Sequence, residues 1–158
     1  MKKGIIALIS TIFGVGAGAV GASKIVGKSA LKNQKMSEKH LAIMLLFNQW
    51  LTVKQEGKSI EEYFIKNNYK KIAIYGMSYV GERLYEELKN SNIEIKYAID
   101  RNADSMYADI EIFKPEDQLE NVDAVIVTAI SFFDDIEKSL KEKLSCPIIS
   151  MEDILYEI

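Results

Sequence analysis

The stretch KKIAIYGMSYVG, residues 70–81, organises the rest of this chain, and the run ERLYEEL follows it at residues 82–88. Its β-branched first half predicts a short strand that stops at Gly76. Apolar residues then recur every four positions, at Val80, Leu84 and Leu88, which predicts a helix. A strand, a glycine turn and a helix in this order are typical of the first unit of a parallel α/β sheet.

The turn between strand and helix predicts a binding site for an anion. Gly76 permits a backbone conformation that a side chain would forbid, and Gly81 lets the helix pack close to the strand. The N–H groups of Ser78, Tyr79 and Val80 would stand unpaired at the helix start, where the dipole favours a phosphate, a pyrophosphate or a carboxylate. The dinucleotide fingerprint G-x-G-x-x-G has glycine where this chain has Ser78, whose Cβ crowds a pyrophosphate but whose hydroxyl could donate to a phosphate oxygen.

A second strand is predicted at residues 93–99, IEIKYAI, and it ends at Asp100, 19 positions beyond Gly81. A carboxylate at this place can accept hydrogen bonds from a ribose diol. The next residue, Arg101, could stack on an adenine or meet an extra phosphate, although a solvated surface arginine is the simpler interpretation. The complete strand, helix, strand and acidic residue predict a Rossmann-like fold.

The remaining sequence continues the alternation of strands and helices after an irregular polar loop at residues 101–108. Strands are predicted at residues 110–113, 122–129 and 146–150, with a helical turn at 115–117, a helix at 132–144 and a short last helix capped by Ser150. The right-handed crossover rule then predicts a parallel sheet of about five strands in the order 3-2-1-4-5 over residues 70–158. The strand end at residues 128–131, beginning with Thr128, should line the same crevice as Gly76, because ligands gather beyond the carboxyl ends of the strands.

Ligand-binding residues are therefore predicted, but catalytic and metal-binding ones are not. The predicted binding set is Gly76, Met77, Ser78, Tyr79, Val80, Gly81, Asp100, Arg101 and Thr128. His40 is the single histidine and lies outside the predicted strands, so no Ser/His/Asp set is expected at the crevice. The single Cys146 excludes an internal disulfide and is expected to be a small buried apolar residue. Whether the chain is an enzyme stays open.

Residues 4–23 form an uncharged segment of 20 residues flanked by lysines. As a helix it would span roughly 30 Å, the thickness of a hydrocarbon core. We favour a single membrane anchor for it, with a cleaved secretory signal and a soluble glycine-rich helix as the alternatives. Because the lysines follow the segment, the positive-inside rule predicts a single-pass protein of the cell membrane with a cytoplasmic C-terminal domain. Gly14, Gly18 and Ala22 form a small-xxx-small face suited to a homodimer or to another membrane protein.

Residues 24–69 connect the anchor to the α/β domain, which gives the predicted boundaries 1–23, 24–69 and 70–158. Residues 24–36 are rich in lysine and suit a position near anionic headgroups. A long helix is predicted at residues 37–55, with an apolar band broad enough to pack on the sheet or on a second copy. Ser59 opens a further short helix with a capping box, and its Tyr63 and Phe64 are expected in the core.

The charge of the chain argues against nucleic acid as a partner. Its 158 residues carry a net charge of −3, and the second half holds no basic stripe.

Several of these segments resemble a known group of domains. The run KIAIYGMS with Gly81, the strand end AIDR at residues 98–101, VDAVIVT at 122–128 and PIIS at 147–150 are similar to Rossmann-type NAD(P)- or nucleotide-sugar-binding domains of bacterial surface-polysaccharide proteins. The resemblance covers about residues 70–158 and implies a nucleotide-type ligand, with Gly76, Ser78, Gly81 and Asp100 at the binding positions. Ser78 in place of glycine speaks against dinucleotide use.

The resemblance also implies a role as a membrane-anchored nucleotide or nucleotide-sugar binding module accessory to polysaccharide biosynthesis, with NAD(P) or a nucleotide-sugar as the candidate ligand. One alternative is a non-catalytic assembly protein with a degenerate Rossmann fold. An autonomous enzyme, such as a small NAD-dependent oxidoreductase or a methyltransferase, is a weaker alternative, because residues 70–158 leave no room for a substrate domain.

Overall fold

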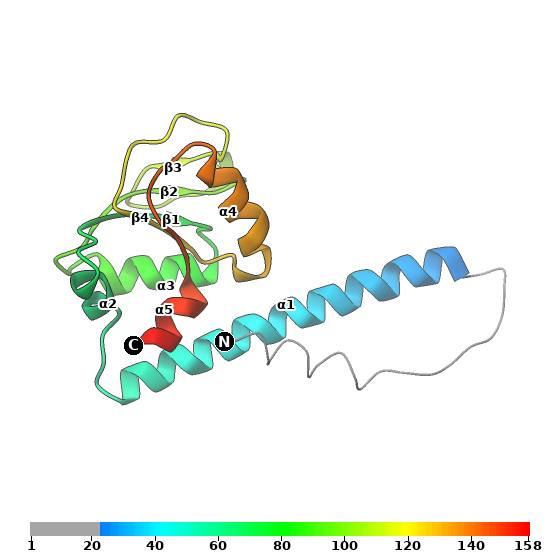
Figure 1. Cartoon of the computed structure of the whole chain (residues 1–158). Helices are drawn as coiled ribbons and strands as arrows, with labels where there is room; N and C mark the ends of the chain where they lie inside the picture. The colour runs from blue at the N-terminus through cyan, green and yellow to red at the C-terminus, as the bar shows by residue number, and fades with distance from the viewer. Residues whose placement is uncertain (1–22) are drawn as a thin grey trace. The chain divides into compact units, whose positions relative to one another are not determined.

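The computed structural model describes residues 23–158 of the chain (Figure 1). The predicted anchor, residues 4–23, lies outside the described residues except for Ser23. The chain divides into two compact units, Met1–Ser37 and Glu38–Ile158, and the α/β domain belongs to the second. In the part that the structure describes, no helix combines the length and the apolar character that crossing a bilayer requires.

The helices and strands alternate as the sequence predicts. In chain order they are α1 Ser23–Gln55, α2 Ile60–Lys66, β1 Lys71–Tyr75, α3 Tyr79–Leu88, β2 Glu94–Ile99, β3 Ile112–Phe113, β4 Ala124–Val127, α4 Phe133–Lys141, β5 Ile148–Ser150 and α5 Met151–Glu157. Short 3₁₀ helices at Ala103–Ser105 and Ile130–Phe132 precede β3 and α4. The predicted helical turn at residues 115–117 is a hydrogen-bonded turn and does not continue as a helix.

The five strands form one parallel sheet in the order β3-β2-β1-β4-β5, which confirms the predicted order. The chain adds strands on one side of β1 and then returns to add β4 on the other side. The carboxyl ends of β1 and β4 therefore meet where the direction of winding reverses, which is the ligand position of open α/β sheets.

Helices cover both faces of this sheet, with α3 and α5 on one side and α4 on the other (Figure 1). Alternate residues of β1 point into two separate apolar clusters. Ile72 and Ile74 pack toward α2, α3, α5 and the second half of α1, whereas Ala73 and Tyr75 pack toward α4. Burial on both faces explains why β1 and β4 read as nearly continuous apolar runs.

Two serines begin their helices as predicted. The hydroxyl oxygen of Ser59 accepts a hydrogen bond from the N–H of Glu61, and that of Ser150 accepts one from Glu152. Each bond satisfies a donor that the first helical turn leaves free. Tyr63 is buried in the core that α2 shares with the sheet, and Phe64 is fully buried there, also as predicted.

The second half of α1 packs into the core of the α/β domain, which is one of the two packing partners predicted for it. Trp50 is buried against the core, and its indole N–H donates to the carboxylate of Glu87 on α3 at 2.8 Å. Lys54 approaches the same carboxylate at 2.6 Å. These contacts place the second half of α1 beside α3.

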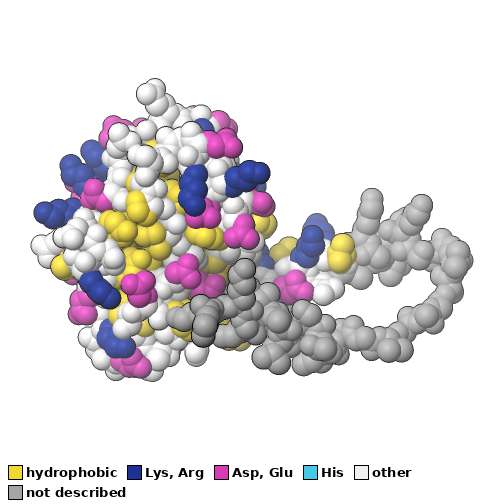
Figure 2. All heavy atoms as spheres, in the orientation of Figure 1, with side chains coloured by type: hydrophobic (Ala, Val, Ile, Leu, Met, Phe, Trp, Pro, Cys, Tyr) yellow, Lys and Arg dark blue, Asp and Glu magenta, His cyan; other side chains and the backbone are white. Residues whose placement is uncertain are grey.

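Charged side chains of both signs are interspersed on the face of the molecule shown in Figure 2. Several form ion pairs with neighbours, such as Lys89 with Glu86 and Lys141 with Glu137, both at 2.7 Å. Exposed pairs of this kind contribute little to stability.

Candidate functional site

The glycine turn between β1 and α3 depends on the absence of two side chains. Gly76 has a φ of +96°, a conformation that residues with a Cβ rarely adopt, and a Cβ there would lie 2.8 Å from the hydroxyl oxygen of Thr128. At Gly81 a Cβ would lie 2.0 Å from the carbonyl oxygen of Gly76. The first turn of α3 therefore rests directly on the backbone that leaves β1.

Thr128 fixes the turn from the end of β4. Its side chain is 5% exposed, and its hydroxyl donates to the carbonyl oxygen of Gly76 at 2.5 Å. The carbonyl oxygen of Tyr75 lies 3.1 Å from the same hydroxyl. The hydroxyl has one proton, and it donates this proton to the backbone of the turn. Thr128 is therefore better placed to hold the turn in position than to donate a hydrogen bond to a ligand.

Asp100 fixes the turn from the end of β2. One oxygen of its carboxylate accepts a hydrogen bond from the N–H of Met77 at 2.9 Å, and the other accepts one from the N–H of Asn102, also at 2.9 Å. The acidic residue thus points toward the glycine turn. Each carboxylate oxygen keeps a further lone pair with which it can accept a ligand hydroxyl.

The start of α3 offers the amides that the sequence predicts. Among the described residues, no acceptor receives a hydrogen bond from the N–H groups of Ser78, Tyr79 or Val80. Ser78 is the N-cap residue in an extended conformation, is exposed, and makes no capping hydrogen bond with its side chain. Three amides and the positive end of the helix dipole therefore face the same place, which favours an anion there.

A pocket of about 240 Å³ lies beside these amides, at the carboxyl ends of β1 and β4, and we call it the switch-point pocket. It is lined by the glycine turn, the segment after β4 and α1, through Lys39, His40, Ile43, Gly76, Ser78, Tyr79, Val80 and Thr128–Phe132. The Lys39 ammonium also lies 5.6 Å from the centre of the Phe132 ring. The pocket lining thus includes a cation as well as the residues at the start of α3.

The position of His40 corrects a prediction from the sequence. His40 was expected away from the crevice because it lies outside the strands, but α1 brings it to the switch-point pocket together with Ser78 and Ser131. The sequence did indicate that the apolar band of α1 packs on something. It did not indicate that this packing would bring Lys39 and His40 to the glycine turn.

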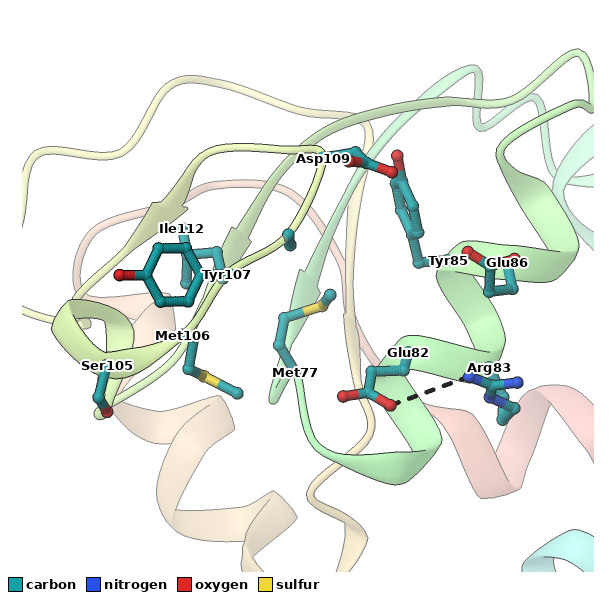
Figure 3. A pocket seen from close by; sticks show the side chains of 11 residues that line it. Met77, Glu82, Arg83, Tyr85, Glu86, Ser105, Met106, Tyr107, Asp109 and Ile112 are labelled. Carbon is teal, nitrogen blue, oxygen red and sulfur yellow. Dashed lines mark ion pairs between the residues drawn. The ribbon is translucent and has the colours of Figure 1, made fainter.

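A larger hollow of about 470 Å³ lies between α3 and the connection from β2 to β3, and we call it the crossover pocket (Figure 3). This connection was predicted to be irregular, and it holds only the short 3₁₀ helix Ala103–Ser105. Met77, Met106 and Ile112 give the hollow an apolar floor, while Glu82, Glu86 and Asp109 bring carboxylates to its edge. Its edge is more acidic than that of the switch-point pocket and suits a phosphate less well.

The predicted binding residues are therefore divided among several places. Gly76, Ser78, Tyr79, Val80 and Thr128 line the switch-point pocket, and Met77 lines the crossover pocket. Gly81 and Asp100 support the turn through the backbone contacts described above. Arg101 is exposed in the turn after Asp100 and lines neither pocket of the described residues.

The pKa values of Tyr97 and Cys146 are raised, but neither residue lines either pocket. Burial raises the pKa of Tyr97 to about 12, and the Tyr97 hydroxyl donates to the backbone carbonyl of Glu120. Burial also raises the pKa of the half-buried Cys146 thiol, which favours the unreactive protonated form. Within residues 23–158, no group of three or more histidine, cysteine, aspartate or glutamate side chains could hold a metal ion.

The sheet and the glycine turn lie within a segment that matches a known family. The family model described as C2185-like, N-terminal, matches residues 68–152. The chain belongs to the C2185-like N-terminal family. No curated protein and no solved structure matches it. The C2185-like segment includes all five strands and the turn, but it begins after α1 and α2, so Lys39 and His40 lie outside it.

Proposed function

We propose that this C2185-like chain is a membrane-anchored module that binds a nucleotide or a nucleotide-sugar and serves an enzyme of bacterial surface polysaccharide assembly. The observation that carries the proposal is a set of three amides, from Ser78, Tyr79 and Val80, which donate to no acceptor within residues 23–158 and lie at the switch point of a parallel sheet. A phosphate group is the ligand that such amides and a helix dipole bind best.

Two further features support a nucleotide over a free phosphate. The carboxylate of Asp100 is held beside the glycine turn, at the strand end from which such a residue reaches a ribose diol. The ammonium of Lys39, which lines the same pocket, adds a positive charge for a second phosphate. NAD(P) is a weaker candidate than a nucleotide-sugar, because the Cβ of Ser78 stands where the dinucleotide fingerprint has glycine.

The proposed binding role is tested by the thermal stability of the full-length chain in a mild detergent. UDP-glucose, NAD⁺ and S-adenosylmethionine are each added in excess. A ligand at one hundred times its dissociation constant stabilises the folded state by about 2.7 kcal/mol, so the right class raises the melting temperature measurably.

A charge at the α3 N-cap makes this test specific for the site. Ser78→Asp places a carboxylate against the proposed phosphate position, yet aspartate is itself a favourable N-cap residue and preserves the helix. The variant should keep the stability of the parent chain and lose the ligand-induced shift. Ser59→Asp, the same change at the N-cap of α2, should keep that shift. A shift that survives Ser78→Asp would contradict the proposed site.

A non-catalytic assembly protein is the second candidate, and the bonds of Asp100 favour it. Because the carboxylate already accepts from the amides of Met77 and Asn102, it has a structural use that requires no ligand. A chain that none of the three ligand classes stabilises would support this candidate.

The proposed membrane anchor has a separate test. The full-length chain should sediment with bacterial membranes after alkaline carbonate washing, and a chain lacking residues 1–23 should not. Release of the full-length chain by carbonate would contradict an anchor at residues 4–23.

A further inference from the structure

α1 is apolar on two opposite faces in the part that belongs to the unit Glu38–Ile158. One face is buried in the domain core through Leu46, Trp50 and Val53. The other face carries large apolar side chains that stay exposed, namely Leu41 at 38%, Met44 at 59%, Leu45 at 45% and Leu51 at 56%. At about 100° of rotation per residue, the centres of these faces point in nearly opposite directions. The domain that buries the first face therefore leaves the second uncovered.

The exposed face has the spacing of a coiled-coil seam. Leu41, Met44, Asn48 and Leu51 follow one another at intervals of three, four and three residues, which are successive a and d positions of a heptad. Leu45 occupies the neighbouring e position. Asn48 is exposed in the middle of this seam, at an a position. A single asparagine at such a position pairs with its counterpart in a second identical helix and specifies the register.

Three lysines of α1, Lys32, Lys35 and Lys39, are placed away from this seam. In the same heptad register Lys32, Lys35 and Lys39 fall at b and f positions, on the outside of a two-stranded coiled coil. Two copies lying side by side would therefore not bring these charges together. Lys54 falls at a g position, where its ammonium is paired with Glu87 of the same domain. A helix that lies on a membrane surface would need its lysines beside the apolar face, at the level of the headgroups. The arrangement thus favours a second copy of the chain over a lipid surface.

We propose that the seam formed by Leu41, Met44, Leu45, Asn48 and Leu51 is the interface of a homodimer, with the two α1 helices parallel and in register. Each copy contributes the same surface, so the contact closes after two chains and leaves no unpaired seam. Asn48 of one copy lies opposite Asn48 of the other, where the two side-chain amides hydrogen-bond. This interface is independent of the nucleotide proposal.

The oligomeric state of the full-length chain in a mild detergent tests the seam. Its molar mass at micromolar concentration is measured by sedimentation equilibrium. Leu51→Lys should raise the dissociation constant of the dimer by roughly tenfold or more, because two charges would replace apolar contacts. Ile65→Lys on α2 is the matched control, since Ile65 and Leu51 are both 56% exposed. This control should leave the dimer unchanged.

Disulfide cross-linking tests whether the two α1 helices are parallel and in register. In a Cys146→Ser background, Asn48→Cys should give a cross-linked dimer on mild oxidation, because parallel helices in register bring the two new thiols together. Lys35→Cys, at an outer b position, should stay uncross-linked.

Three results would overturn the proposed dimer. One is a monomer at micromolar concentration, and another is a dimer that Leu51→Lys leaves intact. The third is loss of binding to anionic vesicles in Leu51→Lys with an unchanged mass, which would assign the seam to a lipid surface.

Discussion

Gly81 carries the sharpest quantitative prediction of this fold. Replacing it with alanine adds a Cβ that would lie 2.0 Å from the carbonyl oxygen of Gly76 and 3.0 Å from its carbonyl carbon. Both neighbours are backbone atoms in a turn that Thr128 and Asp100 hold in place. The clash can be relieved only if the first turn of α3 moves away from β1 by about an ångström, since carbon and oxygen rarely approach closer than roughly 3.3 Å.

The expected size of the effect follows from two opposing contributions. Alanine is a better helix former than glycine by about 1 kcal/mol, so helix propensity alone predicts that Gly81→Ala stabilises the chain. Forcing extra volume into a tightly packed place costs roughly 1–3 kcal/mol and sometimes more. Because rigid backbone receives the clash, we expect the upper end of this range. The net prediction is a loss of about 2 kcal/mol in the free energy of unfolding.

Urea unfolding of the full-length chain measures this loss. Trp50 is the single tryptophan and is buried against the core, so its fluorescence reports the unfolding of the α/β domain. Gly57→Ala is the control, because Gly57 has a φ of +73° but no atom lies within 4 Å of the added Cβ. That variant should lose about 1 kcal/mol from the left-handed conformation alone. A Gly81→Ala chain as stable as the parent, or more stable, would refute the close approach of α3 to the turn.

Two further predictions concern side chains that hold elements together. Asp123 accepts hydrogen bonds from the backbone amides of Lys70 and Lys71, both at 2.8 Å, and these bonds lower the pKa of its carboxyl below the ordinary 3.8. The stability that the Asp123 carboxylate contributes is present above about pH 4 and is lost as the pH falls through the lowered pKa. Asp123→Asn should therefore lower the free energy of unfolding at pH 7, and the difference from the parent chain should shrink in acid. Urea unfolding at several pH values measures this difference. A pH-independent difference would contradict this assignment. Glu87→Leu should lower the free energy of unfolding by about 1–3 kcal/mol and change the fluorescence spectrum of Trp50, because the buried indole N–H would lose its acceptor. An unchanged spectrum and an unchanged stability would contradict the hydrogen bond between Trp50 and Glu87.

Several parts of the fold and the site were predictable because their determinants are local. The apolar spacing of Val80, Leu84 and Leu88 specifies a helix within ten residues, and all three are buried as expected. Ser59 and Ser150 act as N-caps through bonds that span only two residues. The strand order followed from the β-α alternation, because the handedness of crossovers leaves few other arrangements.

The bounds of the short edge strand could not be predicted from local sequence alone. Strand β3 was predicted at residues 110–113 and covers only Ile112–Phe113, since an edge strand pairs with one neighbour and its length depends on that neighbour. The positions of the predicted site residues also depended partly on contacts that the local sequence does not specify. Ser78 was expected at the anion position and lines the pocket there, whereas Arg101, predicted from its adjacency to Asp100, does not.

By itself the sequence determined the glycine turn, the caps and the order of the strands, because each depends on residues close together in the chain or on a handedness that all chains share. Only the tertiary structure decided that Asp100 binds the amide of Met77 and that α1 brings Lys39 and His40 to the turn. It also decided which apolar face of α1 the domain buries and which it leaves exposed. These outcomes depend on packing between segments far apart in sequence, which no local periodicity encodes.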